Sequence, residues 1–415
     1  MFNSHRKNTV RYYLLLIVFL LFLFFSGDFG LIDVQKTAIV MAVGIDKEED
    51  AFIVTSQIAV PQEDKQGKST QTVQLVSRGK TVADAFEDIN AKTGWYPKLV
   101  FCHLIILGEE TVKTDAFDAL DFFLLDEYMS DNCLLATCDG LAKDLLNVTA
   151  LVDSSGSLAM QKVLSQHAER VGTVHPTTLR EFAIGYFSES GSASLPVLQT
   201  RPQQEHGLGD DSTENGAGGQ ETQNGQSGGQ GENQGSGTQP QNNEQDKPVF
   251  SASETALFKR GKRVGTLTKE ETFALNAVQN DLRLATYTVN DGARVCSLSI
   301  KRNDAETKSK IGDGGRVTCK IELTLTAGLL DSSKSLPLEQ SADAGDTPNN
   351  ALVAAERLLS SQIQAVFEKC RASGCDLFRI TQDLQKLQHK KFYKVKTSAL
   401  ENAVLDLSVR FRGVR

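Results

Sequence analysis

The chain begins with basic residues followed by a long apolar run. Residues 14–25 carry no polar side chain, and Arg6, Lys7 and Arg11 precede them. A basic head, an apolar run and a polar body are typical of an export signal or a single membrane anchor. The residues of the run are Leu14, Leu15, Leu16, Ile17, Val18, Phe19, Leu20, Leu21, Phe22, Leu23, Phe24 and Phe25.

The pattern alone leaves two interpretations of this run open. Its length suits the core of a cleaved signal, whereas a spanning helix needs about 20 residues. The segment Tyr12–Ile32 reaches that length, with Asp28 inside it. In both cases the charge bias places the basic head in the cytosol and the body outside it.

Residues 33–200 show strand patterns first and then alternate strands with helices. Ala38–Ile45 is apolar on both faces, which predicts an inner strand. A turn over Asp46–Asp50 leads to a return strand, Phe52–Val60, which Pro61 should end. Further strands are expected over Gln71–Ser77, Lys98–Leu107, Cys133–Cys138 and Ser194–Leu198, and helices after Thr81 and over Phe117–Leu124, Leu141–Leu146 and much of 158–187.

The second half repeats the mixture. A hairpin is predicted around Arg260–Lys262, and Thr268 should cap the helix that follows it. Strands are expected over Val295–Ile300, Val317–Leu325 and Leu405–Phe411, and helices over Asn349–Cys370, ended by Gly374, and over Leu377–Leu387. The predicted fold class is α+β: an N-terminal membrane anchor followed by two or three mixed α/β domains with largely antiparallel sheets.

A polar tract separates the two halves. Residues 203–247 contain eleven Gly and ten Gln, and too few apolar residues to offset the entropy of ordering. We expect a disordered linker there. The expected division is 1–32 for the head and anchor, 33–200 for an N-terminal domain with a possible split near 150, 201–249 for the linker, and 250–415 for a C-terminal domain.

Charge and cysteine content exclude some classes of function. The net charge is −8, but the tract alone carries eight acids and one base, so the remainder is nearly neutral. A nucleic-acid-binding protein needs a basic face, so we expect no nucleic-acid partner. Seven cysteines leave at least one unpaired in an exported protein. The two C-x4-C spacings, Cys133/Cys138 and Cys370/Cys375, are long for a zinc site, and we expect no metal and no cofactor.

Catalytic signatures are scarce. The G-x-S-x-G match at 225–229 lies in the polar tract, whereas a nucleophile elbow needs a strand before it and a helix after it. His103 stands in an apolar strand pattern, where a structural role is commoner than catalysis, and His175-Pro176 is typical of a helix-start turn. The residues alone therefore predict a membrane-tethered, non-cytosolic α+β protein with no catalytic residues.

Several segments, taken in order, resemble the Ger(x)C family, the C subunits of nutrient germinant receptors in bacterial endospores. No single motif is specific, but their order and spacing together are. The segments are Ala38–Asp46 with its Gly44-Ile45-Asp46 ending, Ser77–Ala85, His103–Glu110, Glu254–Lys259, Val264–Leu267, Gly374–Phe378 and Val409–Gly413.

The resemblance implies a non-enzymatic protein on the outer face of the spore inner membrane. Its partners would be a permease-like subunit and a multi-helix membrane subunit, and the complex would trigger germination in response to nutrients. The matched positions are expected to determine the fold rather than to bind ligand: Gly44 and Gly79 would allow turns, and Thr81 would cap a helix. The full set is Gly44, Asp46, Gly79, Thr81, His103, Gly108, Asp376 and Phe378.

One departure from the family bears on the apolar run. Family members are usually lipoproteins with an acylated Cys directly after the run, but Asp28 stands there and the first cysteine is Cys102. Lipid attachment is therefore not expected, and we predict a retained anchor over about Tyr12–Ile32. Two other classes stay open: a free-standing extracytoplasmic protein that binds a small ligand or the cell wall, and a hydrolase with an unrecognised site.

Overall fold

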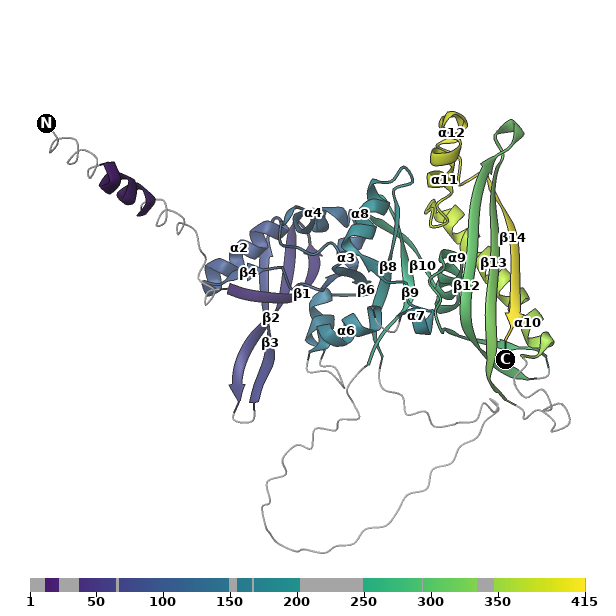
Figure 1. Ribbon diagram of the computed structural model, residues 1–415, viewed down its shortest axis with the longest axis horizontal. Coiled ribbons are helices and arrows are strands. Elements are labelled where there is room, and N and C mark those ends of the chain that lie inside the picture. The colour runs from purple at the N-terminus through teal and green to yellow at the C-terminus, as the bar shows by residue number, and fades with distance from the viewer. Residues whose placement is uncertain are drawn as a thin grey trace, which may run out of the picture.

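The computed structural model describes residues 12–21, 37–64, 67–148, 155–165, 168–201, 249–292, 294–333 and 347–414. These residues form two β-sheets with helices packed on them, arranged one after the other along the long axis of the molecule (Figure 1). The tract at 203–247, predicted to be disordered, lies outside the described residues.

The first sheet, sheet A, is ten-stranded and mixed. Its main order is β10-β9-β8-β6-β5-β1-β2-β3, with β4 on β1 and β7 on β6. The pairs β1–β5, β5–β6 and β6–β8, in the middle of this order, are parallel. The pairs on either side of them, β1–β2, β2–β3, β8–β9 and β9–β10, are antiparallel. The strands are β1 (Thr37–Glu48), β2 (Ala51–Asp64), β3 (Gly67–Gly79), β4 (Tyr96–Lys98), β5 (Leu104–Leu107), β6 (Leu134–Cys138), β7 (Thr177–Thr178), β8 (Ser192–Arg201), β9 (Val249–Lys259) and β10 (Lys262–Leu267).

Helices cover both faces of sheet A, which explains why its inner strands are apolar on both sides. One core includes side chains from α2 (Val82–Thr93), α3 (Glu109–Lys113), α4 (Phe117–Leu125) and α8 (Leu179–Phe187). The opposite core includes side chains from α5 (Ala142–Asn147) and α6 (Gly156–Leu164), and a short helix, α7 (Ala168–Val171), follows. In β1, Val43 and Ile45 face the first core, and Ala42 faces the second.

The second sheet, sheet B, has the order β11-β12-β13-β14. A long antiparallel hairpin, β12 (Val295–Ile311) and β13 (Val317–Ser332), lies between β11 (Thr286–Asn290) and β14 (Ala403–Gly413). The last strand pairs in parallel with β13. One face packs against α9 (Lys269–Gln279), α10 (Asn349–Ser373), α11 (Ile380–Leu387) and α12 (His389–Val395).

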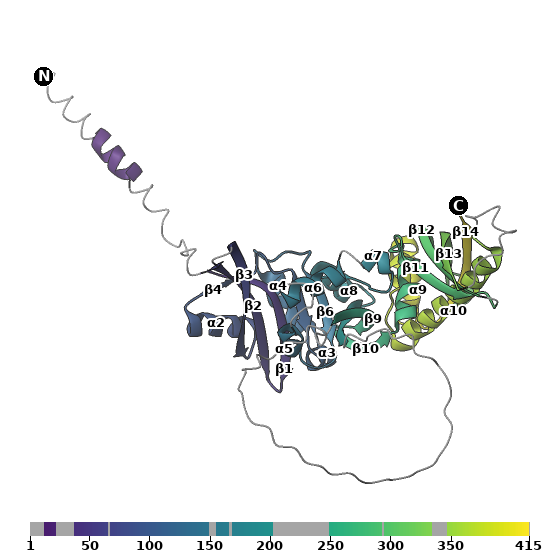
Figure 2. The ribbon, with the colours of Figure 1, turned by 90° about the horizontal axis from the view of Figure 1, so that it is seen from below.

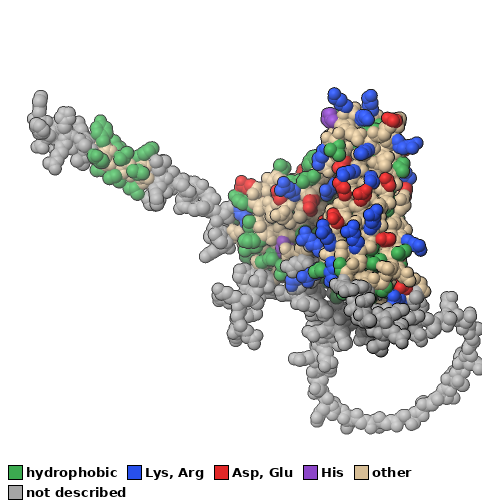
Figure 3. Space-filling view, turned by 45° about the vertical axis from the view of Figure 1, so that its right-hand side comes forward, with side chains coloured by type: hydrophobic (Ala, Val, Ile, Leu, Met, Phe, Trp, Pro, Cys, Tyr) green, Lys and Arg blue, Asp and Glu red, His purple; other side chains and the backbone are tan. Residues whose placement is uncertain are grey.

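The other face of sheet B carries charged side chains. Lys308 pairs with Glu306, Lys320 with Glu322 and Arg302 with Asp304, each within one strand. Lys and Arg are interspersed with Asp and Glu over this part of the surface (Figure 3). Exposed pairs of this kind contribute about 0–1 kcal/mol each, so this face is a solvated surface rather than a source of stability.

The prediction of a mixed α/β fold with antiparallel-rich sheets is confirmed, with corrections at the level of elements. Asp46 lies in β1, not in a turn, and the turn is at Glu49-Asp50. Pro61 does not end β2: the strand continues to Asp64 in its pairing with β3, where Pro61 lies opposite Thr70, and β1 pairs with β2 only up to Ala59. The strand predicted over Lys98–Leu107 is two strands, β4 and β5, separated by a loop.

Further differences concern the length and the number of the elements. The strands β12 and β13 extend far beyond the apolar segments that predicted them, because the extension of β12 is largely polar even at its less exposed positions, such as Asn303, Thr307 and Ser309, and so shows no apolar alternation. The sequence analysis missed β11 entirely; its pattern Thr-Tyr-Thr-Val-Asn buries only Tyr287 and Val289. The helical region predicted over 158–187 is three helices with β7 between the second and third.

The structure leaves the predicted anchor unconfirmed. Residues 12–21 are helical and their side chains are exposed, while residues 22–32 fall outside the described ranges. Within the described ranges, no helix is both long and apolar enough to cross a membrane.

Candidate functional site

Three of the family-motif residues meet where β1 and β5 end. The Asp46 carboxylate accepts hydrogen bonds from the backbone N–H of Ala142 (2.7 Å) and of Lys143 (3.0 Å), at the start of α5. The N-cap residue of α5, Leu141, has no side-chain acceptor, so a strand residue 96 positions earlier supplies the cap. Burial raises the pKa of the Asp46 carboxyl, and the two N–H donors partly offset that rise.

Gly44 and Gly108 make room for this junction. A Cβ on Gly44 would lie 2.9 Å from Leu146 Cδ1 and 3.1 Å from Ala142 Cβ, and one on Gly108 would collide with the Asp46 carboxylate. The turn predicted at Gly44 is therefore wrong: Gly44 lies within β1, and its missing side chain allows α5 to approach the sheet closely.

Gly79 has a similar position beneath α2. It is the last residue of β3, and a Cβ there would collide with the backbone N of Ala85. Neither Gly44 nor Gly79 has a positive φ, so close approach rather than turn geometry excludes a side chain. Thr81 Oγ1 accepts the N–H of Asp84 (3.1 Å) and caps α2.

The Gly374–Phe378 segment joins the two halves of the chain. Gly374 ends α10 with φ 68°. The thiol of the following residue, Cys375, donates to Phe258 O (3.2 Å). The Asp376 N–H donates to Ser192 Oγ of β8 (2.9 Å), and its carboxylate accepts the N–H groups of the first two residues of α11 (3.0 and 2.7 Å). Phe378 packs edge-on against Phe367, with ring centroids 5.3 Å apart.

His103 lies in the loop before β5 and is half-buried. Its backbone N–H donates to Met41 O (3.0 Å), and its carbonyl accepts from Leu134 N (3.0 Å). Its Nε2 has no hydrogen-bond partner among the described residues. Burial lowers the pKa of its imidazole. His103 therefore stands apart from the Asp46 junction and from Asp376.

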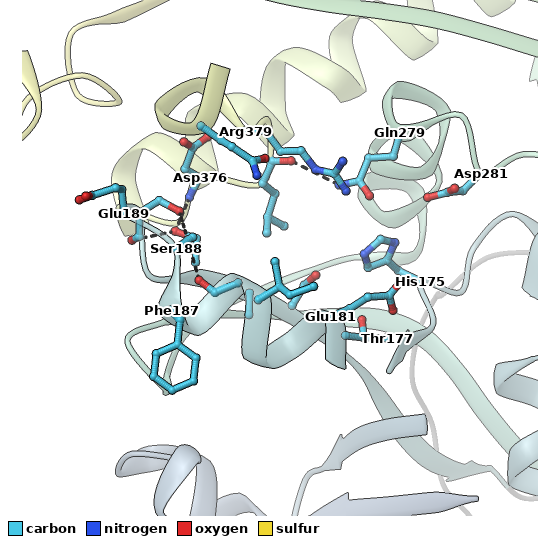
Figure 4. Close-up of a pocket in the computed structure, with 18 of the residues that line it drawn as sticks. His175, Thr177, Glu181, Phe187, Ser188, Glu189, Gln279, Asp281, Asp376 and Arg379 are labelled. Carbon is cyan, nitrogen blue, oxygen red and sulfur yellow. Dashed lines mark hydrogen bonds between the residues drawn. The ribbon is translucent and has the colours of Figure 1, made fainter. Parts of the chain in front are cut away.

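A cleft of about 830 Å³ lies between the two halves, lined by α8, β8 and the loop before α8 on one side and by α9 and α11 on the other. Asp376 is the family-motif residue that lines it. In the close-up, Ser188 and Glu189 lie at one end and His175 and Asp281 at the other (Figure 4). The ends of the cleft thus carry polar groups from both halves of the chain.

The His175 side chain has a defined tautomer. Asn276 Nδ2 donates to Gly172 O (3.0 Å) and to Val174 O (2.8 Å), which fixes the orientation of its amide. The Asn276 Oδ1 is then the acceptor for His175 Nδ1 at 2.8 Å, so Nδ1 carries the proton and Nε2 is left as an acceptor. Burial lowers the pKa of His175, and this favours the neutral ring.

These groups can form hydrogen bonds and ion pairs with a polar ligand. Glu181, Glu189, Asp281 and Arg379 line the cleft, and all four are exposed. The orienting partner of His175 is the side-chain amide of Asn276, and the described residues that line the cleft include no cysteine to complete a Cys-His-Asn set. Over the described part of the chain, no three His, Cys, Asp or Glu side chains come together as a metal site.

Apart from Asp376, sequence reasoning missed the residues of the cleft and the amide that orients His175. His175 carried the signal of a turn, and Asn276 lay unnoticed within an amphipathic helix. Nothing in the local pattern shows that these two residues, 101 positions apart, share a hydrogen bond. The seven cysteines are all buried and free, and burial raises the pKa of Cys375 and of Cys319 to about 12.

Comparison with known proteins gives both halves of the chain the same assignment. Residues 31–200 match the family described as "Spore germination protein N-terminal domain", and residues 253–412 match "Spore germination B3/ GerAC like, C-terminal". The comparison with curated proteins found no match. The two matched regions define a spore germination protein, and the chain belongs to the Ger(x)C family.

A solved structure, "Crystal Structure of the GerBC protein", has a similar fold. The match has a TM-score of 0.51 and 15% sequence identity, and it covers 89% of this chain and 96% of that chain. At this identity the likeness concerns the fold alone. The match covers most of both chains, so the similarity of fold is not confined to one of the two sheets.

Proposed function

We propose that this chain is a non-enzymatic, membrane-anchored subunit of a spore germinant receptor. It assembles with a permease-like subunit and a multi-helix membrane subunit, and the complex triggers germination in response to nutrients. The observation that carries the proposal is the ordered match of 31–200 and 253–412 to the two spore germination domains. Family membership supports a role in a germinant receptor, and the named partners and the trigger are the proposed part.

The anchor and the location belong to the same proposal. Residues 14–25 hold the protein in the spore inner membrane without a lipid, since Asp28 stands where an acylated Cys would be. The basic head lies on the cytosolic side and the two sheets lie on the outer face. The motif residues Gly44, Asp46, Gly79, Thr81, Gly108, Asp376 and Phe378 contribute to folding, and the contacts described above support this role.

The test is genetic and biochemical. Spores that lack this chain should lose germination with particular nutrients, and expression of the intact chain should restore it. A tagged copy should co-purify from detergent-solubilised spore membranes with a permease-like protein. The variant Asp46→Ala serves as a control for folding. If it does not restore germination and is also missing from the membrane, the defect is one of folding rather than of signalling.

The cleft favours one alternative, a free-standing protein that binds a small extracytoplasmic ligand. Small-molecule sites are concave and bring together a few polar groups, and this cleft contains His175, Glu181 and Arg379. The alternative predicts saturable ligand binding by the purified chain and normal germination of spores in which the permease-like subunit alone is deleted. The receptor proposal predicts the opposite germination result.

A further inference from the structure

The N-terminal body exposes a group of large apolar side chains at one end. Leu125 is 84% exposed, Phe101 60% and Tyr128 52%. Their neighbours on the same segments are also exposed, and we call the whole set the aromatic patch: Trp95, Tyr96, Val100, Phe101, Leu125 and Tyr128. Large apolar groups gathered on a surface mark a binding interface.

Contacts between their side chains and backbones bring these segments together. The ammonium of Lys98 lies 4.7 Å from the centroid of the Tyr128 ring. Cys102 and Cys133 lie in the same core, and Leu134 N donates to His103 O (3.0 Å), which places the loop after β4 beside the end of the loop after α4. The stacking of Phe86 on Phe122 holds the last turn of α4 against α2, and Leu125 is the last residue of α4, three positions before Tyr128.

The aromatic patch lies where the chain from the apolar run enters the fold. Tyr96 of β4 pairs directly with Thr37, the first residue of β1. Eleven residues lie between Phe25 and Thr37, and the twelve steps from one to the other, at about 3.4 Å each, span at most about 40 Å. Two views place β4 and α2 at the end of the molecule far from sheet B (Figures 1 and 2).

We propose that the aromatic patch rests in the headgroup region of the bilayer that holds residues 14–25. This inference rests on the proposed anchor and adds to it a second, direct contact with lipid. Trp and Tyr prefer the membrane–water interface, where the ring is half-desolvated and the polar atom stays hydrated. Lys98 suits the same place, because its stem covers the Tyr128 ring while its ammonium reaches the headgroups.

Because the anchor holds the fold close to the bilayer, even a small apolar patch is sufficient for contact with lipid. A short chain holds the patch near the bilayer at an effective concentration of about millimolar, so contact needs little affinity of its own. Contact at this end directs sheet B and the charged surface of Figure 3 away from the membrane. The orientation leaves the cleft between the two halves accessible from the side.

Trp95 is the only tryptophan of the chain and reports on this contact directly. The full chain is reconstituted in phosphatidylcholine–phosphatidylglycerol vesicles, and flotation checks that it is membrane-bound. Compared with a patch variant in the same vesicles, Trp95 emission should lie at shorter wavelength. Lipids brominated near the headgroup should quench this emission, and aqueous iodide should quench it less than in the patch variant.

The variant is Phe101→Ser with Leu125→Ser, two exposed side chains whose loss leaves the core intact. The matched control is Leu387→Ser, 70% exposed in α11 of the other body, and circular dichroism verifies folding of each. The patch variant should float but regain iodide quenching and lose bromolipid quenching, while the control behaves like the unmodified chain.

Each alternative result overturns the inference. A chain that floats but has Trp95 accessible to iodide and insensitive to brominated lipid retains its anchor and has no lipid contact at the patch. Shielding from iodide without bromolipid quenching shows a protein contact instead. A chain that does not float has no anchor, and then the membrane part of the proposed function fails together with the patch.

Discussion

Two buried carboxylates each cap the N-terminus of a helix. Asp46 supplies the cap of α5 from a strand, and Asp376 supplies the cap of α11 from the segment that contacts β8. Both belong to the motifs by which the chain resembles its family. Each carboxylate thus fixes the start of one helix against another element, so these residues position parts of the fold relative to one another.

Replacing Asp46 should therefore destabilise the protein. Asp46→Ala removes the acceptor of two buried N–H groups and should lower the free energy of unfolding by about 2 kcal/mol. Asp46→Asn keeps one acceptor oxygen and should lose less. Urea denaturation measures both, with Asp50→Ala in the exposed turn as the control. Equal stability of the Ala variant and the control would contradict the capping role.

His175 should make stability depend on pH. Its pKa is lowered in the folded protein, so the unfolded chain binds the proton more tightly. The contribution of neutral His175 to the free energy of unfolding is then fully present above the ordinary His pKa of about 6.5. This contribution is lost as the pH falls below that value. His175→Gln, which cannot be protonated, should make this fall shallower.

The matched control for that measurement is His389→Gln, since His389 is exposed on α12. His103, whose pKa is also lowered, remains in both variants and keeps part of the fall. Denaturation curves at several pH values would contradict the account if His175→Gln and His389→Gln gave the same slope.

Residue roles were predictable from the sequence only when they are local. Thr81 and Thr268 cap helices that begin at the next residue, and this arrangement is visible in the chain itself. The roles of Asp46 and of Asn276 depend on residues about 100 positions away. Such partners follow from strand order, which the local pattern does not contain.

At the scale of elements, glycines set how closely helices approach the sheets. A Cβ at Gly79 would collide with α2, whereas the nearest atom to a Cβ at Gly265 in β10 is 3.6 Å away. Gly79→Ala should therefore cost about 1–3 kcal/mol, and Gly265→Ala should be close to neutral. Thermal or urea unfolding compares them directly, and similar effects of the two substitutions would argue against close approach as the reason.

The elements themselves were largely predictable, but not their pairing. The amphipathic pattern predicted α10 and its end at Gly374, which has the left-handed φ that suits glycine. The strand β14 was predicted from Leu405 to Phe411, yet nothing local shows that it pairs in parallel with β13. A parallel partner must be reached by a crossover, here the three helices α10–α12.

At the scale of the molecule, sheet A contains strands from both halves of the chain. The strands β9 and β10 follow the polar tract, yet β9 pairs with β8 from Ser192 to Arg201. The domain division expected at 201–249 therefore separates two strands that are neighbours in one sheet. Sequence composition shows where a chain changes character, and it does not show which strands return to an earlier sheet.

Cleavage of the tract should leave the two halves together. Endoproteinase Glu-C has several sites within residues 203–247, where we expect disorder. The fragments should co-elute in size-exclusion chromatography, because the β8–β9 ladder and the Asn276 contacts still join them. Separation of the fragments without denaturant would contradict this arrangement.

The most direct test of the central claim is nutrient germination of spores that lack this chain. Loss of refractility is followed after addition of single amino acids and sugars, in the deletion strain and in the same strain carrying the intact gene. The receptor proposal predicts that germination with at least one nutrient is lost and that the intact gene restores it. Normal germination of the deletion strain with every nutrient to which the parent spores respond would contradict it.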